Sequence, residues 1–245
     1  MGLGVGLGGG WQLGLQLPLE RRSVDVRYTS GGAPYDPPYQ DIHHRDEVLQ
    51  GLADGQAAVQ RLGRAAGGVW MAELGSTVPL GQTHPDPYAA GARGARHQHN
   101  QLGLGAPAPF ASAAWVGAPA PVGALGSARV QAPLVENRHG MRGPLLLVGA
   151  GGASARLSPE VVGMAQAELV IEGPERWSGA PQGGRTALSL ALAAEWAPGP
   201  RLSLLGDLRL PVASWLGSAA TASEEHGRLQ VGPLVGLTVA WTAAR

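Results

Sequence analysis

The segment Thr186–Val212 constrains the fold more than any other part of the chain, because it alternates strictly on both sides of a turn. Leucine, alanine and tryptophan occupy every second position before the turn Ala197–Pro200, and leucine, glycine and valine do so after it. A period of two on both sides of a Pro/Gly turn predicts an antiparallel hairpin. Each arm has about 10 residues, the length of a tilted strand that crosses a hydrocarbon core.

Composition excludes several other classes of protein. Only 15% of the 245 residues are charged and the net charge is zero, so no basic surface for nucleic acid is expected. Cysteine is absent, which excludes disulfides and thiolate chemistry. Because no apolar run reaches about 18 residues, the sequence also excludes a transmembrane helix.

The same alternation recurs along the chain and predicts eleven arms. Short turns join the arms at one end, and longer polar connections join them at the other. The weakest arm is Ala53–Gly63, which could instead belong to a helix that starts at Asp46. The other predicted arms are Gly2–Leu7, Trp11–Leu19, Val69–Leu80, Gln101–Val116, Val122–Val135, Pro144–Leu157, Val161–Glu172, the two arms of the Thr186–Val212 hairpin and Leu229–Trp241. Loops are predicted at Ser30–Leu52, Gly81–Asn100, Glu136–Gly143, Gly173–Arg185 and Ala213–Gly227.

The two faces of the arms differ in chemistry. One face is aliphatic, and the other carries small residues, glutamines and charges of both signs, with no charge expected on the aliphatic face. A soluble barrel places apolar side chains inside, whereas a membrane barrel turns them toward lipid, where a charge costs about 2–4 kcal/mol. We therefore predict that the aliphatic face meets lipid. Trp70, Trp196 and Trp241 lie near arm ends on that face, as in an aromatic girdle. The polar residues predicted to face the lumen are Gln12, Gln16, Glu73, Arg129, Gln131, Glu168, Glu195, Asp207 and Arg209.

The predicted fold is all-β, a single domain over residues 1–245 that forms an antiparallel up-and-down transmembrane β-barrel in a bacterial outer membrane. Single-chain bacterial barrels have an even number of strands. We therefore expect that the eleven arms belong to a 12-stranded protein whose signal peptide and first strand are missing from this sequence. The alternatives are a soluble β-protein with the tryptophans in its core and a Gly-rich chain without a stable fold.

Three stretches carry a resemblance to a known family: GLGGGWQLGLQLPLE (Gly6–Glu20), ELGSTVPLG (Glu73–Gly81) and HNQLGLGAPAPF (His99–Phe110). The sequence resembles the meta-pathway phenol-degradation family of outer-membrane transporters. In that family a strand that ends in Leu-Pro leads to a loop with an Asp-Pro pair, which is replaced here by Ala108-Pro109. The resemblance implies an outer-membrane barrel for uptake of small hydrophobic compounds, and it defines no functional residues.

Clusters of histidine and acidic residues lie in the predicted loops. His97 and His99 could form a metal pair if they lay on a strand, but their spacing matches no closed site, so exposed loop histidines are the expectation. The groups around His43-His44, His139 and His226 place no nucleophile beside a base, which nucleophilic catalysis requires. Asp207 and Arg209 are expected to pair inside the barrel or to line a constriction. We expect no enzyme, no cofactor and no bound metal.

The expected function is passage of a small solute, which can be hydrophobic, through the barrel. The expected partners are outer-membrane lipid and that solute, and no nucleic acid. Two other functions stay open at this point. A structural or adhesive barrel would use its loops to contact partners without transport, and a barrel hydrolase would need a loop histidine for activity. The sequence defines no substrate.

Overall fold

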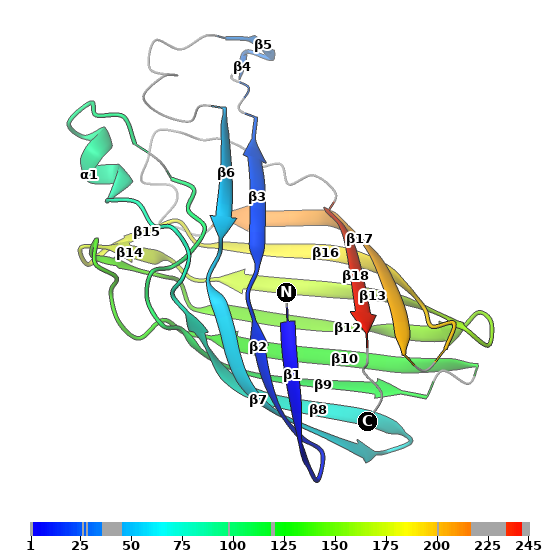
Figure 1. The fold of residues 1–245 in the computed structure, drawn as a ribbon. Coiled ribbons are helices and arrows are strands. Elements are labelled where there is room, and N and C mark those ends of the chain that lie inside the picture. Colours follow the sequence, from blue (N-terminus) through cyan, green and yellow to red (C-terminus); the bar gives the residue numbers. More distant parts are fainter. Residues whose placement is uncertain are drawn as a thin grey trace.

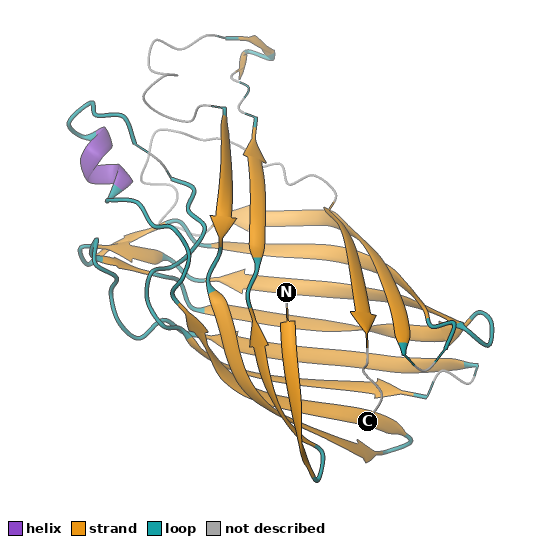
Figure 2. Cartoon of the chain, viewed as in Figure 1, coloured by secondary structure: helices purple, strands orange, loops and turns teal. Residues whose placement is uncertain are grey.

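Antiparallel strands make up almost all of the computed structural model (Figure 1), and Figure 2 shows one short helix among them. Residues 2–25, 27, 29–35, 46–97, 99–118, 121–199, 201–216 and 234–241 are described. No helix among them is long and apolar enough to span a membrane. The main sheet has 11 strands in the order β1 (Gly2–Gly8), β2 (Trp11–Gln16), β7 (Gly55–Ala65), β8 (Gly68–Val78), β9 (Pro109–Gly117), β10 (Val122–Gln131), β12 (Leu146–Arg156), β13 (Val161–Glu172), β16 (Arg185–Trp196), β17 (Leu202–Leu216) and β18 (Leu234–Trp241).

Each strand of the main sheet pairs with the strand that precedes it in the sheet order, always antiparallel. The eleven predicted arms are therefore present as one up-and-down sheet, which curls around on itself (Figure 1). β1 and β18 are its two edges, and no ladder joins them among the described residues. The described strands thus form a curled sheet, and closure into a barrel stays a prediction.

The strands are joined by tight turns at one end of the sheet and by long connections at the other, as the sequence predicts. The turn from β1 to β2 uses Gly8, Gly9 and Gly10, whose φ angles are +88°, +59° and +81°. L-residues rarely adopt these values. At Gly10 a Cβ would also collide with the carbonyl oxygen of Leu62 on β7, so this turn requires glycine on both counts.

The connection from β2 to β7 is ordered where the sequence predicted a loop. β3 (Leu19–Val24) pairs with β6 (Glu47–Leu52) in a two-stranded ribbon that projects beyond the main sheet (Figure 1), and β4 (Thr29–Ser30) pairs with β5 (Ala33–Pro34). The loop predicted over Ser30–Leu52 is therefore wrong at β6, and so is the alternative of a helix from Asp46. The pairing of β3 with β6 is non-local, which explains why a local pattern missed it.

Two further predictions about strand bounds are wrong. The arm predicted to begin at Gln101 begins at Pro109, because Gly105 has a φ of +67° and the prolines of this stretch donate no ladder hydrogen bond. At the other end of the chain, β17 runs on through Pro211 to Leu216, although the arm was predicted to end at Val212 and a loop to begin at Ala213. A register shift opposite Leu188 and Ser189 accommodates this proline, as a β-bulge does.

Smaller elements occupy the long connections. Helix α1 (Pro87–Gly91) begins after Asp86, whose carboxylate accepts hydrogen bonds from the amides of Tyr88 and Ala89 at 2.9 and 3.1 Å. A side-chain acceptor in this place satisfies helix donors that have no partner within the helix. β11 (Met141–Arg142), β14 (Glu175–Trp177) and β15 (Ala180–Gln182) form a separate three-stranded sheet, inside stretches predicted as loops.

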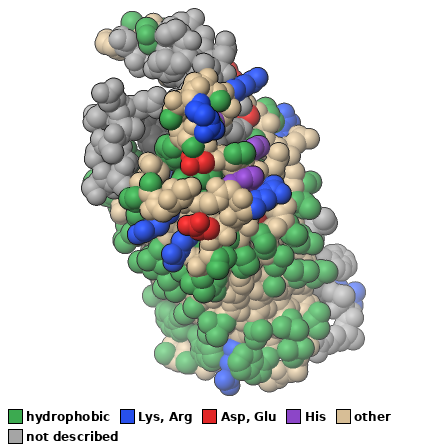
Figure 3. Space-filling view, turned by 90° about the vertical axis from the view of Figure 1, so that its left-hand side faces the viewer, with side chains coloured by type: hydrophobic (Ala, Val, Ile, Leu, Met, Phe, Trp, Pro, Cys, Tyr) green, Lys and Arg blue, Asp and Glu red, His purple; other side chains and the backbone are tan. Residues whose placement is uncertain are grey.

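The two faces of the main sheet differ as the alternation predicts. Leu74 is 68% exposed and Leu190 48% exposed, whereas Glu168 on the opposite register is 9% exposed. Figure 3 shows hydrophobic side chains gathered over the lower part of the molecule and most of the charged side chains of this face in its upper part. A sheet that exposes its leucines and keeps its acids buried or half-buried is the inverse of a soluble protein.

Tryptophans line the tight-turn end of the aliphatic face. Trp11, Trp70, Trp115 and Trp196 share its register and lie within a few residues of a tight turn. The backbone of Trp241 pairs with Leu202 at the same end. Trp11 and Trp196 are each 43% exposed. This distribution is typical of the aromatic girdle of a membrane barrel.

Candidate functional site

The polar face of the curled sheet is the candidate site. Cross-strand pairing places all nine residues predicted to face the lumen on one register, opposite the exposed leucines. Arg129 on β10 reaches Gln56 on β7 although β8 and β9 lie between them. Side chains converge in this way on the concave side of a curled sheet, so the polar face is the inner one. The nine residues are Gln12, Gln16, Glu73, Arg129, Gln131, Glu168, Glu195, Asp207 and Arg209.

A row of polar residues crosses β8, β9 and β10 at one level of the inner face. Glu73 lies opposite Ser112, and Ser112 lies opposite Arg129. The Glu73 carboxylate accepts hydrogen bonds from Gln60 Nε2 and Ser112 Oγ, each at 2.9 Å. The acid therefore has a partner on each side, as a polar group away from bulk water requires.

Arg129 is held by neutral partners. Its Nη2 donates to Gln131 Oε1 at 2.9 Å and to Gln56 Oε1 at 3.3 Å. Its guanidinium carbon lies 3.7 Å from the centroid of the Phe110 ring, in a cation–π contact. These contacts leave the positive charge of Arg129 uncompensated by any direct ion pair among the described residues. The row thus presents a carboxylate on β8 and a guanidinium on β10 at one level of the inner face.

A second polar cluster lies on β13, β16 and β17. Arg209 Nη1 donates to Glu168 Oε1 at 2.9 Å, and the Glu168 side chain is only 11% exposed. The predicted pair of Asp207 with Arg209 is therefore wrong. Residues two apart on a strand both point inward, but Arg209 reaches across the sheet to a buried acid, and the Asp207 carboxylate lies against Gly236 on β18.

Acids on the inner face of β13 and β16 also have partners. Glu195 accepts a hydrogen bond from Ser203 Oγ at 2.6 Å. Glu172 pairs with Arg185 at 2.7 Å, where β13 meets the long connections. Several partners were absent from the predicted lumen set although the same period of two would have found them: Gln56, Gln60, Ser112 and Arg185.

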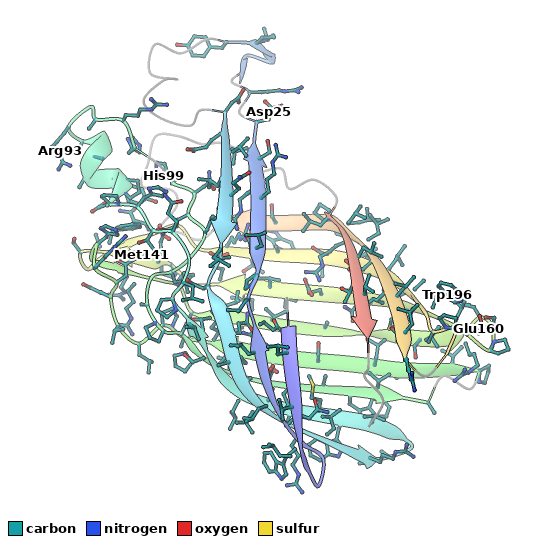
Figure 4. The ribbon with its side chains drawn as sticks, viewed as in Figure 1. Asp25, Arg93, His99, Met141, Glu160 and Trp196 are labelled. Atoms are coloured by element: carbon teal, nitrogen blue, oxygen red, sulfur yellow. The ribbon has the colours of Figure 1, made fainter. Side chains whose placement is uncertain are left out.

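The long connections pack together at one end of the sheet. Asp54, between β6 and β7, binds both ends of the connection from β8 to β9, because its Oδ1 accepts from the Gly81 amide at 2.9 Å and its Oδ2 from the Leu104 amide at 2.6 Å. Asn137 donates to the Leu104 carbonyl at 2.9 Å and accepts from the amide of Met141 at 3.1 Å. Figure 4 shows Met141 and His99 at this end and Glu160 and Trp196 at the opposite one. We call the connections held by Asp54 and Asn137, together with the three-stranded sheet of β11, β14 and β15, the cap.

Helix α1 and β14 bring two titratable groups of the cap together. Burial raises the pKa of Glu175, although Trp177 Nε1 donates to its carboxylate at 2.8 Å. Burial, which is the largest cause, and the charges of Glu175 and Asp86 together raise the pKa of Tyr88 to about 12. Burial is thus the main cause of both shifts.

The raised pKa of Glu175 predicts that this part of the cap is stabilised by acid. A group whose pKa is raised on folding favours the folded state below its unfolded pKa, and that contribution is lost as the pH rises through the folded pKa. We therefore expect amide exchange in β14 and α1 to slow between neutral and mildly acidic pH, once the intrinsic pH dependence is removed. Glu175→Gln should abolish this dependence. An unchanged pH profile in this variant would contradict the prediction.

The histidines show no catalytic arrangement in the described residues. His97 and His99 lie outside any strand with their ring centroids 5.0 Å apart, and His97 Nδ1 lies 2.9 Å from the Ala95 carbonyl. No group of three potential metal ligands occurs among the described residues. Arg138 donates to the His139 ring at 3.1 Å. His43, His44 and His226 lie outside the described residues.

Comparison with known proteins supports the fold. The sequence matches no protein-family model and none of the curated proteins. The structure is similar to the COG4313 outer membrane channel from Pseudomonas putida F1, with a TM-score of 0.59 and 13% sequence identity over 96% of this chain and 77% of the other. The chain therefore has the fold of an outer membrane channel.

Proposed function

We propose that the protein is an outer-membrane channel or transporter for small solutes. The observation that carries this proposal is the inversion of the main sheet, with exposed leucines outside and a row of Glu73, Ser112 and Arg129 inside. The likeness to a solved outer membrane channel supports the same function. An apolar exterior suits lipid, and a polar inner wall suits water and a solute.

Closure of the sheet is part of this proposal. In hydrocarbon the amides and carbonyls of an unpaired strand edge cost several kcal/mol each. We therefore propose that the edges of β1 and β18 are paired in the membrane, either with each other or through a further strand. The result would be a barrel of about 12 strands, narrower than a general porin.

The proposed solute is small and uncharged or weakly charged, because the inner wall carries charges of both signs at short range. The resemblance to phenol-degradation transporters favours hydrophobic compounds as the solute. Transport of a phenol-like compound is thus the finer form of the proposal.

Conductance tests the proposal. In planar bilayers we expect discrete open levels from the refolded protein. Arg129→Gln should favour cations and Glu73→Gln should favour anions, each by about fivefold in permeability ratio, because one charge at 4 Å in water is worth about 1 kcal/mol. Glu160→Gln, at a tight turn, serves as the control and should change nothing.

The alternative is a structural or adhesive barrel, and one observation favours it. The β3–β6 ribbon projects beyond the sheet (Figure 1) and exposes Leu19 at 74%, together with Val48 and Leu52. Exposed apolar residues on a projecting ribbon could contact a partner. Electrical silence of a protein that still shows heat-modifiable migration on gels would exclude the channel and favour this alternative.

A further inference from the structure

A groove of about 850 Å³ crosses the outward face of the main sheet from β7 to β13. Most residues that line it share the aliphatic register. Small residues form its floor, while Val59, Leu74, Leu147 and Leu169 form its walls. The floor residues are Ala72, Ala111, Ala113, Ala128 and Gly149.

A second hollow of about 510 Å³ adjoins the groove toward the tight-turn end. The two share Trp70 and three of the floor alanines, and the second adds Trp115 and Gly126. The groove therefore runs from the middle of the outward face to the tryptophan girdle. This is the direction in which an acyl chain lies in a membrane leaflet.

Arg61 lies at the girdle end of this groove. It is the exception to the prediction that the aliphatic register carries no charge, because its pairing with Trp11 and Ala72 places it on that register. Its guanidinium carbon lies 5.1 Å from the centroid of the Trp11 ring. No described acid forms an ion pair with it. A cation on a lipid-facing surface is expected at the interface, beside an anion.

We propose that Arg61 and this groove form a phospholipid site, with the lipid phosphate on Arg61 and one acyl chain along the small-residue floor. The inference rests on the proposed membrane location. Charge complementarity selects the headgroup, since arginine binds phosphate through paired donors. The hollow over the alanines and Gly149 favours an acyl chain, because an apolar chain there makes the contacts that larger side chains would otherwise make.

The groove can be filled without disturbing the strand. A Cβ built on Gly149 meets no atom within 4 Å, and the same holds for Gly206, which faces outward on β17 away from the groove. Gly149→Leu therefore tests the site, and Gly206→Leu is the matched control. Arg61→Gln tests the headgroup contact.

Native mass spectrometry of protein extracted from phosphatidylglycerol vesicles measures the bound lipid. We expect the unmodified protein and Gly206→Leu to retain a phospholipid, and Gly149→Leu and Arg61→Gln to retain it about tenfold less. Equal retention by all four proteins would overturn the inference. So would displacement of the lipid by inorganic phosphate alone, which would show that Arg61 binds an ion without using the groove.

Heat-modifiable migration separates this inference from the proposed function. If all variants fold into vesicles but retain no phospholipid, only the lipid site fails. If the unmodified protein does not insert at all, the proposed membrane function fails with it.

Discussion

Leu190→Arg is expected to destabilise the folded protein strongly in a membrane. Leu190 lies in the middle of β16 on the outward face, between Ala167 and Leu210, and is 48% exposed. An arginine in this position would meet hydrocarbon, at a cost of about 2–4 kcal/mol. Because folded proteins are stable by only about 5–15 kcal/mol, we expect unfolding at a clearly lower denaturant concentration, measured by heat-modifiable migration in vesicles at increasing urea.

Ser127→Arg provides the matched control. Ser127 lies in the middle of β10 on the inward register, is exposed, and faces Ala114 and Ala150 on the neighbouring strands. An arginine there meets water and should leave folding nearly unchanged. If Leu190→Arg were tolerated as well as Ser127→Arg, the aliphatic face would not meet lipid, and the orientation proposed for the sheet would be wrong.

The sequence predicts the main sheet well because each of its strands has an apolar face and a polar face. β13 has the predicted bounds, Val161–Glu172, and β16 differs from its prediction by one residue. In such strands the period of two follows directly from the alternation of side chains across the sheet. The shared register of the nine polar residues follows from the same alternation, and their facing a lumen stays a prediction.

Alternation of apolar residues predicts a strand wrongly where one side of a segment is buried in a loop instead of a sheet. Leu102, Ala106 and Ala108 alternate like a strand, but they are buried in the cap. There the Thr77 hydroxyl accepts from the Ala108 amide at 2.8 Å and lies 3.5 Å from the Ala106 carbonyl. Such contacts join residues about 30 positions apart, and no local pattern contains them.

Partner choice on the inner face is the other part that the sequence could not supply. Register shows that Arg209 points inward, but two acids are within its reach, and the pairing of β13, β16 and β17 brings Glu168 to it. The sequence alternation of β7 also places Arg61 on the aliphatic face. Its contact with Trp11 could not be predicted in the same way, because Trp11 lies about 50 positions earlier and pairs with it only in the folded sheet.

Asp54→Ala is expected to release the cap from the sheet. Asp54 lies just before β7 and accepts hydrogen bonds from the Gly81 and Leu104 amides. A hydrogen bond to a charged group contributes about 1.5–3 kcal/mol. Since Asp54 is half-buried, we expect the loss of both bonds to destabilise the cap by about 2–4 kcal/mol. Amide exchange at Gly81 and Leu104 should then accelerate by roughly 30-fold to several hundred-fold.

Asp54→Asn separates charge from shape at the same position. The asparagine amide can accept one of the two bonds, but its NH₂ group would face the other donor, so we expect an exchange rate between that of the unmodified protein and that of Asp54→Ala.

Asp25→Ala is the control, because Asp25 pairs with Arg27 in an exposed ion pair at 3.2 Å, and such pairs contribute little to stability. Equal exchange in Asp54→Ala and Asp25→Ala would show that Asp54 does not hold the cap. If exchange accelerates in the cap alone while the strands stay protected, the cap opens independently of the main sheet, as a movable cover over the mouth of the proposed channel must.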